Sequence, residues 1–276
     1  MWPYRLVTCV WQALLREHPD RLDVEAFTPA TSVVHRVSTN SKAALEVQTP
    51  RGSIKASSVL HCTNGFASRL IPGLVGKIFP LRGTMTVQEP PSSLTNHGGD
   101  RSWAFLRQPE YDTKSGLFDP GLDYLTQNAT SGLFFFGGEK TSLADTFNDD
   151  DTIVTETSKT YLHEKLCRSF GVDRMGLVAA WSGIMGFTGD HLPLVGRLPA
   201  SLTAHGDGGQ FIAAGFNGYG MPTCWLAGEA IAQLALGEAM PQHVPETYII
   251  TEERLQQLTA RGAAEAMLGG CVFTGA

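Results

Sequence analysis

The feature that most constrains the fold is a glycine-rich turn between a short apolar run and a helix. Residues 210–214 are QFIAA, and the turn that follows is Gly215-Phe216-Asn217-Gly218-Tyr219-Gly220. A helix is predicted from about Pro222 to Leu236, because proline at the start and Gly237 past the end are the expected punctuation. Glycine lets the backbone turn sharply and approach a ligand, and the free N–H groups of a helix N-terminus suit an anion or a polarised carbonyl. The same pattern also fits a plain connector, since its GxxGxG order is not that of a dinucleotide fingerprint.

The rest of the chain divides into strand patterns and helix patterns. Short β-branched or alternating runs bounded by Pro, Gly, Asn and Asp predict strands, and longer runs with helical spacing predict helices. The predicted strands cover residues 22–27, 32–37, 44–48, 53–56, 57–62, 84–88, 103–107, 124–127, 133–136, 177–181 and 210–214. The predicted helices cover residues 5–17, 158–170, 222–236 and 252–268. The turn Pro50-Arg51-Gly52 predicts a hairpin, and Gly171 is placed to end the second helix.

The composition is that of an ordinary globular protein and argues against several classes of function. The formal charge is −6, with no basic run, so electrostatics give no support for nucleic-acid binding. No apolar stretch reaches the length of a membrane span, so no membrane association is predicted. The cysteines number five, without a CxxC pair, which predicts free thiols in a reducing compartment, the cytoplasm, and no zinc or other metal site.

Two long motifs resemble those of a known enzyme family. Residues 181–196 read WSGIMGFTGDHLPLVG, and residues 213–221 read AAGFNGYGM. Together they resemble the C-terminal signature of the D-amino-acid oxidase-like FAD-dependent oxidoreductases, a superfamily that includes glycine oxidase and sarcosine oxidase. Three earlier segments agree in order: VLHCTNG at 59–65, FPLRGTM at 79–85, where Thr84 replaces the usual glutamine, and the strand at 133–138. The resemblance covers residues 1–255 of the chain.

The resemblance implies an α/β fold with two parts. One is an FAD/NAD(P)-binding three-layer domain, incomplete here, which would take residues 1–79 and 172–240. The other is an inserted antiparallel, β-rich substrate domain over residues 80–171. Residues 241–276 would form a C-terminal tail with one helix.

The resemblance also implies FAD as the cofactor. In such folds the second glycine-rich turn lies against the flavin, where its N–H groups and the following helix dipole stabilise negative charge on the N1–C2=O edge of the reduced ring. An earlier turn lies near the adenosine half. The matching positions are Thr63, Asn64 and Gly65 for the adenosine half, and Gly215, Phe216, Asn217, Gly218, Tyr219, Gly220 and Met221 for the flavin.

The chain departs from the family pattern at the pyrophosphate site. Family members begin with a strand, a GxGxxG turn and a helix whose N-terminus holds the pyrophosphate. No GxGxxG occurs in the 276 residues. Weak FAD binding, or none, is therefore expected of this chain alone, because the main electrostatic contact for the cofactor is absent.

A second departure concerns the substrate. The amino-acid oxidases of this superfamily typically hold the substrate carboxylate with an arginine that precedes a T-x-D motif, whereas residues 182–187 here are uncharged. Tyr124, Trp181 and Met185 are the candidates to face the substrate, and they favour an apolar amine or an alkaloid-like molecule. The alternative that these three are core side chains stays open.

No catalytic residue is identified. Arg82 and Asp190 are expected to form ion pairs or to shape the site, with a structural role favoured, and His61 and His191 are expected to be structural. Oxidation of a neutral amine by a flavin requires no protein base, so the absence of a candidate base is no objection to this function.

The sequence thus predicts an FAD-dependent oxidoreductase that oxidises a C–N bond of a small amine or amino-acid-like substrate, present as an incomplete polypeptide. The alternative is a non-catalytic remnant or an interaction protein that has lost flavin binding. An NAD-dependent dehydrogenase is a weaker third hypothesis, because no nicotinamide fingerprint exists.

Overall fold

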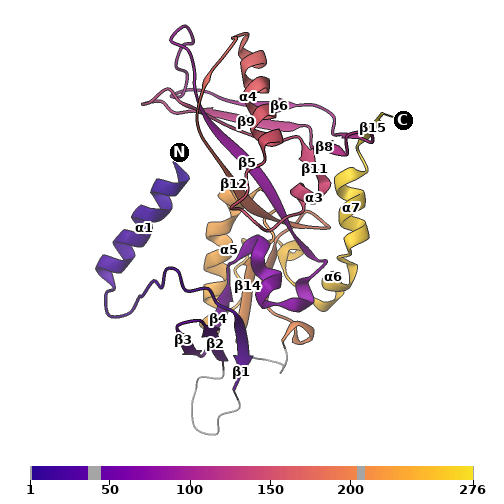
Figure 1. The fold of residues 1–276 in the computed structure, drawn as a ribbon. Helices are drawn as coiled ribbons and strands as arrows, with labels where there is room; N and C mark the ends of the chain where they lie inside the picture. Colours follow the sequence, from indigo (N-terminus) through magenta and orange to yellow (C-terminus); the bar gives the residue numbers. More distant parts are fainter. Residues whose placement is uncertain (1, 37–44, 204–208, 276) are drawn as a thin grey trace.

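The central element of the fold is a two-stranded antiparallel ribbon of β5 (Ile78–Glu89) and β12 (Gly176–Thr188). The computed structural model of the chain describes residues 2–36, 45–203 and 209–275. The ribbon pairs from Thr188 opposite Ile78 to Gly176 opposite Glu89, and in Figure 1 it runs from the lower to the upper part of the molecule. Both strands are longer than the predicted segments 84–88 and 177–181, and the boundary expected between residues 79 and 80 falls inside β5.

The lower part is built on a small sheet with helices on both sides. Its strands, in spatial order, are β13 (Leu194–Arg197), β14 (Gln210–Ala214) and β4 (Val59–His61), of which β14 and β4 are parallel. Helix α5 (Gly220–Ala235) packs on one face. The other face is covered by short helices, which are α2 (Ala67–Leu70), η2 (Pro72–Leu74) and α6 (Glu252–Gln257). The expected α/β layering is confirmed for this part of the chain.

Strand β14 shows why the apolar run at 210–214 forms a buried strand. Phe211 and Ala213 contact the α5 side of the sheet, whereas Ile212 and Ala214 contact the opposite core. Side chains alternate between the two faces of a strand, so a strand covered on both faces must be apolar at every position. All four residues are buried.

The upper part contains a five-stranded antiparallel sheet. In spatial order it is β12, β5, β10 (Phe134–Gly137), β9 (Leu122–Gln127) and β6 (Ser102–Leu106). Helix α4 (Glu156–Phe170) covers one face through an apolar cluster that includes Leu125, Phe134 and Phe136 from the sheet and Leu162 and Leu166 from the helix. Thr155 accepts a hydrogen bond from Ser158 N–H at the start of α4, and Gly171 ends it in the left-handed conformation, as predicted.

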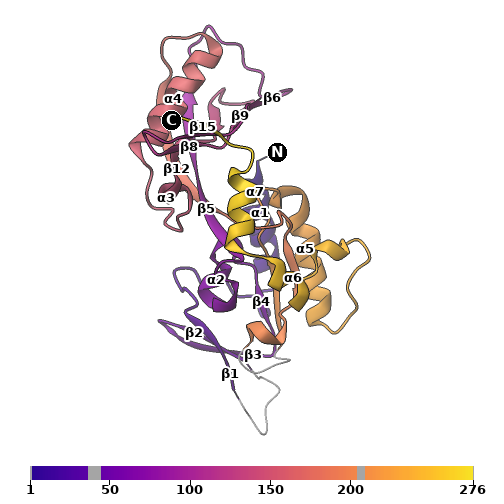
Figure 2. The same cartoon turned by 90° about the vertical axis from the view of Figure 1, so that its right-hand side faces the viewer.

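A second sheet joins the C-terminal segment to the upper part. Its strands are β11 (Thr141–Ser142), β8 (Leu117–Asp119), β7 (Glu110–Asp112) and β15 (Val272–Thr274), with helix α3 (Leu143–Thr146) following β11. Strand β15 pairs parallel with β7, so the C-terminal segment extends from the lower part to the upper part (Figures 1 and 2).

The single helix predicted over residues 252–268 is wrong. The segment forms two helices, α6 and α7 (Ala260–Leu268), because Leu258 adopts an extended conformation that buries its side chain in the lower core. Thr259 then caps α7 by accepting a hydrogen bond from Gly262 N–H. Single-turn 3-10 helices occur at η1 (Asn64–Phe66), η3 (Ala200–Leu202) and η4 (Glu246–Tyr248).

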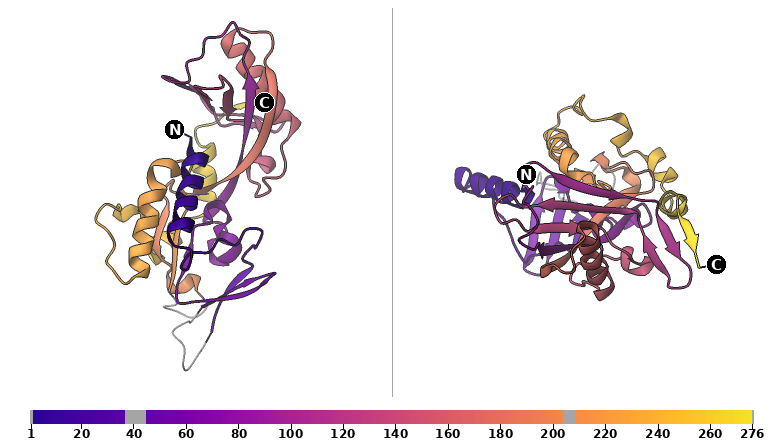
Figure 3. Two further views of the ribbon diagram at one scale, coloured as in Figure 1. Left: turned by 90° about the vertical axis from the view of Figure 1, so that its left-hand side faces the viewer. Right: turned by 90° about the horizontal axis from the view of Figure 1, so that it is seen from above.

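The N-terminal segment begins with α1 (Pro3–Glu17), which confirms the first predicted helix and starts it at a proline. None of its residues is buried, and α1 stands apart from the rest of the molecule in Figure 1 and in the right-hand view of Figure 3. The predicted hairpin forms β2 (Leu45–Thr49) and β3 (Gly52–Ala56), with β1 (Ser32–His35) beside β2. Val37 and Ala44, at the ends of two predicted strands, lie outside the described residues.

The strand predicted over residues 22–27 is wrong. The segment forms turns, and Phe27 has a left-handed backbone and a fully exposed side chain. An alternating pattern forms a strand only where a neighbouring strand offers backbone hydrogen bonds and an apolar surface, and this segment meets neither.

Asp190 and Arg254 form the ion pair that holds α6 to the loop after β12. Arg254 Nε lies 2.8 Å from Asp190 Oδ2, and the same guanidinium donates to the carbonyl oxygens of Leu192 and Pro193. Burial alone would raise the pKa of the Asp190 carboxyl, but hydrogen bonds from Arg254 and Leu192 N–H lower that pKa below its ordinary value. The structural role expected for Asp190 is confirmed.

Replacing Arg254 with alanine is expected to destabilise the fold by about 3 kcal/mol, because it removes the charged partner of Asp190 and one donor each from the carbonyl groups of Leu192 and Pro193. Urea unfolding measures the loss. Arg261→Ala is the matched control, because Arg261 pairs with Glu265 on an exposed helix face and its loss is expected to cost less than about 0.5 kcal/mol. Equal urea midpoints for the two variants would contradict this assignment.

Candidate functional site

The glycine-rich turn and the turn after β4 meet at one edge of the lower sheet. Strands β4 and β14 are parallel neighbours, so their C-terminal ends lie at the same edge. Asn64 Oδ1 accepts hydrogen bonds from Gly215 N–H and Phe216 N–H, at donor–acceptor distances of 2.9 and 3.2 Å. The two segments matched to the two halves of FAD are therefore joined by one side chain.

The end of β12 completes this junction through close backbone packing. A Cβ atom on Gly65 would lie 2.8 Å from Met185 O, and one on Gly186 would lie 2.6 Å from Asn64 Oδ1. Asn217 N–H donates to Gly186 O, and Asn217 Oδ1 accepts from Thr188 N–H, both at 2.8 Å. Only glycine fits at these two contact points, which fixes the turn against the ribbon.

The turn has one side fixed against the protein and one side open. Gly215 and Asn217 are buried, whereas Gly218, Tyr219 and Met221 are exposed. A Cβ on Gly218 or Gly220 would meet no atom closer than 3.8 Å or 3.6 Å. The first N–H groups of a helix have no acceptor within that helix, and no side chain caps those of α5. The open side therefore presents free N–H groups and no obstructing side chain to a ligand.

Left-handed backbone at four positions explains the residue types of the two turns. The φ angles are 46° at Asn64, 74° at Gly215, 54° at Asn217 and 78° at Gly218. Asparagine and glycine are the residues that adopt this conformation most readily. Thr63 lies exposed just before η1, where its carbonyl oxygen accepts from Phe66 N–H.

Tyr124, Trp181 and Met185 lie on one face of the five-stranded sheet, opposite the face that α4 covers. Trp181, Met85, Gly137 and Tyr124 are successive register partners across four strands, so they form a row on this face. A Cβ on Gly137 would overlap Met85 Sδ and the Tyr124 ring, so both side chains converge over this glycine. Met185 follows on the same face and contacts Gly83.

The three side chains are partly exposed rather than core residues. Trp181 is 42% exposed and Tyr124 is 40% exposed. The Trp181 ring lies edge-on to Phe135, with 6.4 Å between centroids. Desolvation, then the charges of Glu139 and Asp123, raises the pKa of Tyr124, so its hydroxyl stays protonated and can donate a hydrogen bond.

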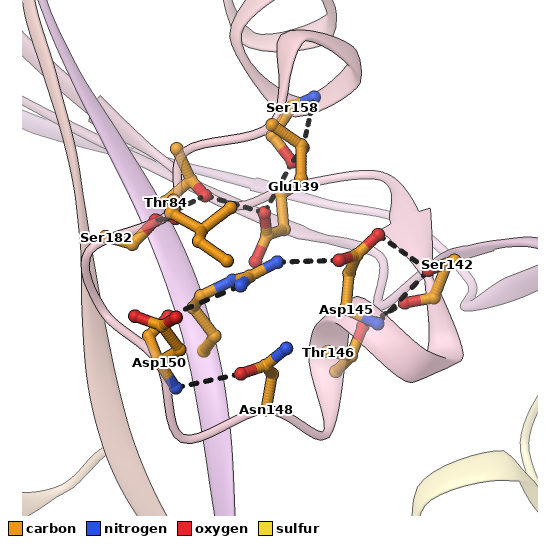
Figure 4. Close-up of polar contacts among 12 residues, drawn as sticks. Thr84, Glu139, Ser142, Asp145, Thr146, Asn148, Asp150, Ser158 and Ser182 are labelled. Carbon is orange, nitrogen blue, oxygen red and sulfur yellow. Dashed lines mark hydrogen bonds and ion pairs between the residues drawn. The ribbon is translucent and has the colours of Figure 1, made fainter.

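A buried polar cluster lies between the sheet and the start of α4 (Figure 4). Glu139 Oε2 accepts from Thr84 Oγ1 at 2.8 Å and from Ser158 Oγ at 2.7 Å, while Oε1 is buried without a partner. Arg82 lies in the same cluster and donates to Asp145 Oδ1 at 2.9 Å, which confirms its structural role. The sequence carried no signal for Glu139, because its partners come from β5 and α4.

The two histidines beside the matched motifs differ in environment. His61 is buried, and its Nε2 lies 2.9 Å from Gln210 Oε1. Burial lowers the pKa of His61, and the contact to Gln210 only partly opposes this effect. His191 is exposed in a left-handed turn.

Membrane spans and metal clusters are both absent from the described part of the chain. No helix within residues 2–36, 45–203 and 209–275 has the length and apolar character needed to cross a membrane. The same residues contain no group of three or more His, Cys, Asp or Glu side chains arranged to hold a metal ion.

The family model for FAD dependent oxidoreductases matches residues 4–234. The chain belongs to this family of FAD-dependent oxidoreductases. A sequence comparison with curated proteins gives no match.

Several solved structures share the fold of this FAD-dependent oxidoreductase family member. Glycine oxidase from Geobacillus kaustophilus has a TM-score of 0.58 and 20% identity, and the match covers 83% of this chain and 53% of the glycine oxidase chain. Iminodiacetate oxidase from Chelativorans sp. has a TM-score of 0.52 and 20% identity, covering 79% and 52%. Fructosyl amine:oxygen oxidoreductase (Amadoriase I) from Aspergillus fumigatus has a TM-score of 0.56 and 13% identity, covering 83% and 49%. The chain thus spans about half the length of these structures.

The Glu139 cluster generates a prediction for stability. Burial, only partly opposed by hydrogen bonds from Ser158 and Thr84, raises the pKa of Glu139. A group whose pKa is higher in the folded chain contributes stability that is present below its unfolded pKa and is lost as the pH rises through its folded pKa. Relative to Glu139→Gln, which keeps an acceptor for both hydroxyls, the wild type is therefore expected to lose stability as the pH rises.

Urea unfolding from about pH 4 to about pH 8 measures this difference. Glu238→Gln, at an exposed position, is the control, and its stability should follow that of the wild type at every pH. A wild type that gains stability over Glu139→Gln with rising pH would show that the carboxyl is stabilised as an anion.

Proposed function

We propose that this chain provides the flavin-facing turn and the substrate-facing sheet of an FAD-dependent oxidoreductase that acts on a C–N bond of an amine or amino-acid-like substrate. The observation that carries the proposal is the open side of the 215–221 turn, held in place by Asn64 and Asn217. The family membership and the solved relatives, whose names include oxidases of glycine, iminodiacetate and fructosyl amines, support this function.

The proposed cofactor contacts divide between the two turns. Backbone N–H groups of Gly218, Gly220 and Met221, at the N-terminus of α5, would stabilise negative charge on the N1–C2=O edge of the ring, whereas Tyr219 N–H donates to Phe216 O. Thr63, Asn64 and Gly65 would lie near the adenosine half. The residues fit such a ligand, because the open side of the turn carries no Cβ at Gly218 or Gly220 and no capping side chain.

The proposed division of the chain follows from these contacts. Residues 1–79 and 172–240 would form the cofactor-binding unit, residues 80–171 the substrate unit, and residues 241–276 the tail. The pairing of β4 with β14 supports joining the two segments of the first unit, because it makes them parts of one sheet.

Oxidation of the C–N bond removes two electrons and two protons from the amine and leaves a C=N bond, with FAD as the electron acceptor. The chain would orient the amine on the face that Tyr124 and Trp181 line. Tyr124 would donate a hydrogen bond rather than act as a base, because its raised pKa keeps the hydroxyl protonated.

A non-catalytic interaction protein is the second candidate, favoured by one observation. Helix α1 has no buried residue and exposes Trp2, Tyr4 and Trp11, which is typical of a surface that binds another protein. In that case the glycine-rich turn would be a connector that recognises no flavin.

Gly220→Leu is expected to weaken FAD binding at least about tenfold, because it places a side chain on the open side of the turn. Gly220 suits this test better than Gly218, whose φ of 78° would strain any side chain. Titration with FAD into the millimolar range, followed by flavin fluorescence, measures the affinity.

Gly228→Leu is the matched control, because Gly228 lies on the same helix in open space and its replacement should leave FAD binding unchanged. Equal affinity of the wild type and Gly220→Leu would contradict the proposed function and favour the interaction protein.

A further inference from the structure

The sheet face that carries Tyr124, Trp181 and Met185 has no cationic side chain within the five strands, and its one charged residue there is Glu89, exposed at the end of β5. We define the open face by its side chains Met85, Tyr124, Phe135, Trp181 and Met185. Apart from Glu89 and two hydroxyl residues, the remaining positions that share this face by register are small or apolar, and they are Phe79, Leu81, Gly83, Val87, Ser102, Ala104, Leu106, Leu122, Thr126, Gly137, Gly176, Ala179, Gly183 and Phe187. A ligand on this face therefore meets no cation from these strands.

Two arginines of the upper part, the buried Arg82 and the half-buried Arg107, are turned away from the open face and already paired. Arg82 lies on the opposite side of β5, where it donates to Asp145. Arg107 follows β6 and donates to both Asp119 and Asp123. A carboxylate placed on the open face would lose its hydration and gain no charged partner, which makes its burial unfavourable.

The aromatic rings of the open face suit a cation or an apolar group. Trp181 and Phe135 pack edge to face, and Tyr124 lies over Gly137 in the same row. The faces of such rings carry partial negative charge, so they attract an ammonium group and repel a carboxylate.

We propose that the open face selects a primary or secondary amine that carries an aromatic or other bulky apolar group and has no carboxylate beside the reacting C–N bond. The proposal rests on the proposed function, since it names the substrate class of that same site. Met185 decides the selection, because it occupies the face with an uncharged side chain above Gly83. Free amino acids, which carry the carboxylate, are thereby disfavoured.

Three ligands with the same ring test the selection on the chain as it exists. These are 2-phenylethylamine, which has the ammonium alone, phenylalanine, which adds a carboxylate, and 3-phenylpropanoate, which has the carboxylate alone. Isothermal titration without FAD is expected to give 2-phenylethylamine at least about tenfold tighter binding than either of the others. Because the assay contains no FAD, its outcome is independent of whether the chain binds flavin.

Variants test whether the ligand binds on the open face. Trp181→Leu is expected to weaken 2-phenylethylamine binding about fivefold, whereas Trp11→Leu, in the exposed helix α1, should leave it unchanged. Met185→Arg is expected to reverse the preference in favour of phenylalanine and 3-phenylpropanoate, because it provides the missing cation.

The proposal is overturned if phenylalanine or 3-phenylpropanoate binds the wild type as tightly as 2-phenylethylamine, or if none of the three binds. It is also overturned if Trp11→Leu weakens 2-phenylethylamine as much as Trp181→Leu. A loss of flavin binding in the Gly220→Leu titration would not affect any of these outcomes.

Discussion

The contact that the rest of the structure depends on is the one that Asn64 makes with the glycine-rich turn. Its side-chain oxygen accepts two backbone hydrogen bonds from residues 151 and 152 positions further along the chain. Those two N–H groups lie at the end of a buried strand, where an unpaired donor would cost about 1–3 kcal/mol. The same oxygen lies so close to Gly186 that no Cβ fits between them. One amide group thus sets the positions of the turn after β4, the turn after β14 and the end of β12.

The ribbon of β5 and β12 connects these fixed turns to the open face. Met185 is the residue where the two meet, because its carbonyl oxygen packs against Gly65 while its side chain reaches Gly83 on the open face. Trp181 lies four residues earlier on the same strand. A displacement of the ribbon would therefore move the 215–221 turn and the side chains of the open face together. The C-terminal segment adds a second link, through Arg254 in the lower part and β15 in the upper part.

Sequence patterns predicted the features that depend on local chemistry. The turn at 215–220, the N-terminal proline of α1 and the left-handed end of α4 at Gly171 follow from what glycine and proline do to a backbone, whatever surrounds them. Features that depend on residues far apart in the sequence were missed or were predicted wrongly. The 182–188 end of β12 is rich in glycine, so it has low strand propensity and forms a strand only because β5 pairs with it. Leu258 interrupts a helical pattern for burial in a core that the pattern does not reveal.

The candidate site shows the same division. Asn64 and Asn217 stand out in the sequence because of the motifs around them, but the hydrogen bonds of Asn64 to the turn after β14 and of Asn217 to the end of β12 are visible only in the fold. Glu139 has no motif and depends on partners from two separate elements, β5 and α4. Tyr124 and Trp181 are ordinary aromatic residues in the sequence, and they share a face because Met85 and Gly137 are their register partners.

The central claim is that the open side of the turn faces a flavin. Amide hydrogen exchange of the chain, with and without millimolar FAD, tests it most directly. The account predicts slower exchange at Gly218, Gly220 and Met221, with smaller effects around Thr63 to Gly65 and no change in α4 or in the sheet beneath it. Unchanged exchange at Gly218, Gly220 and Met221, with protection elsewhere in the chain, would contradict it.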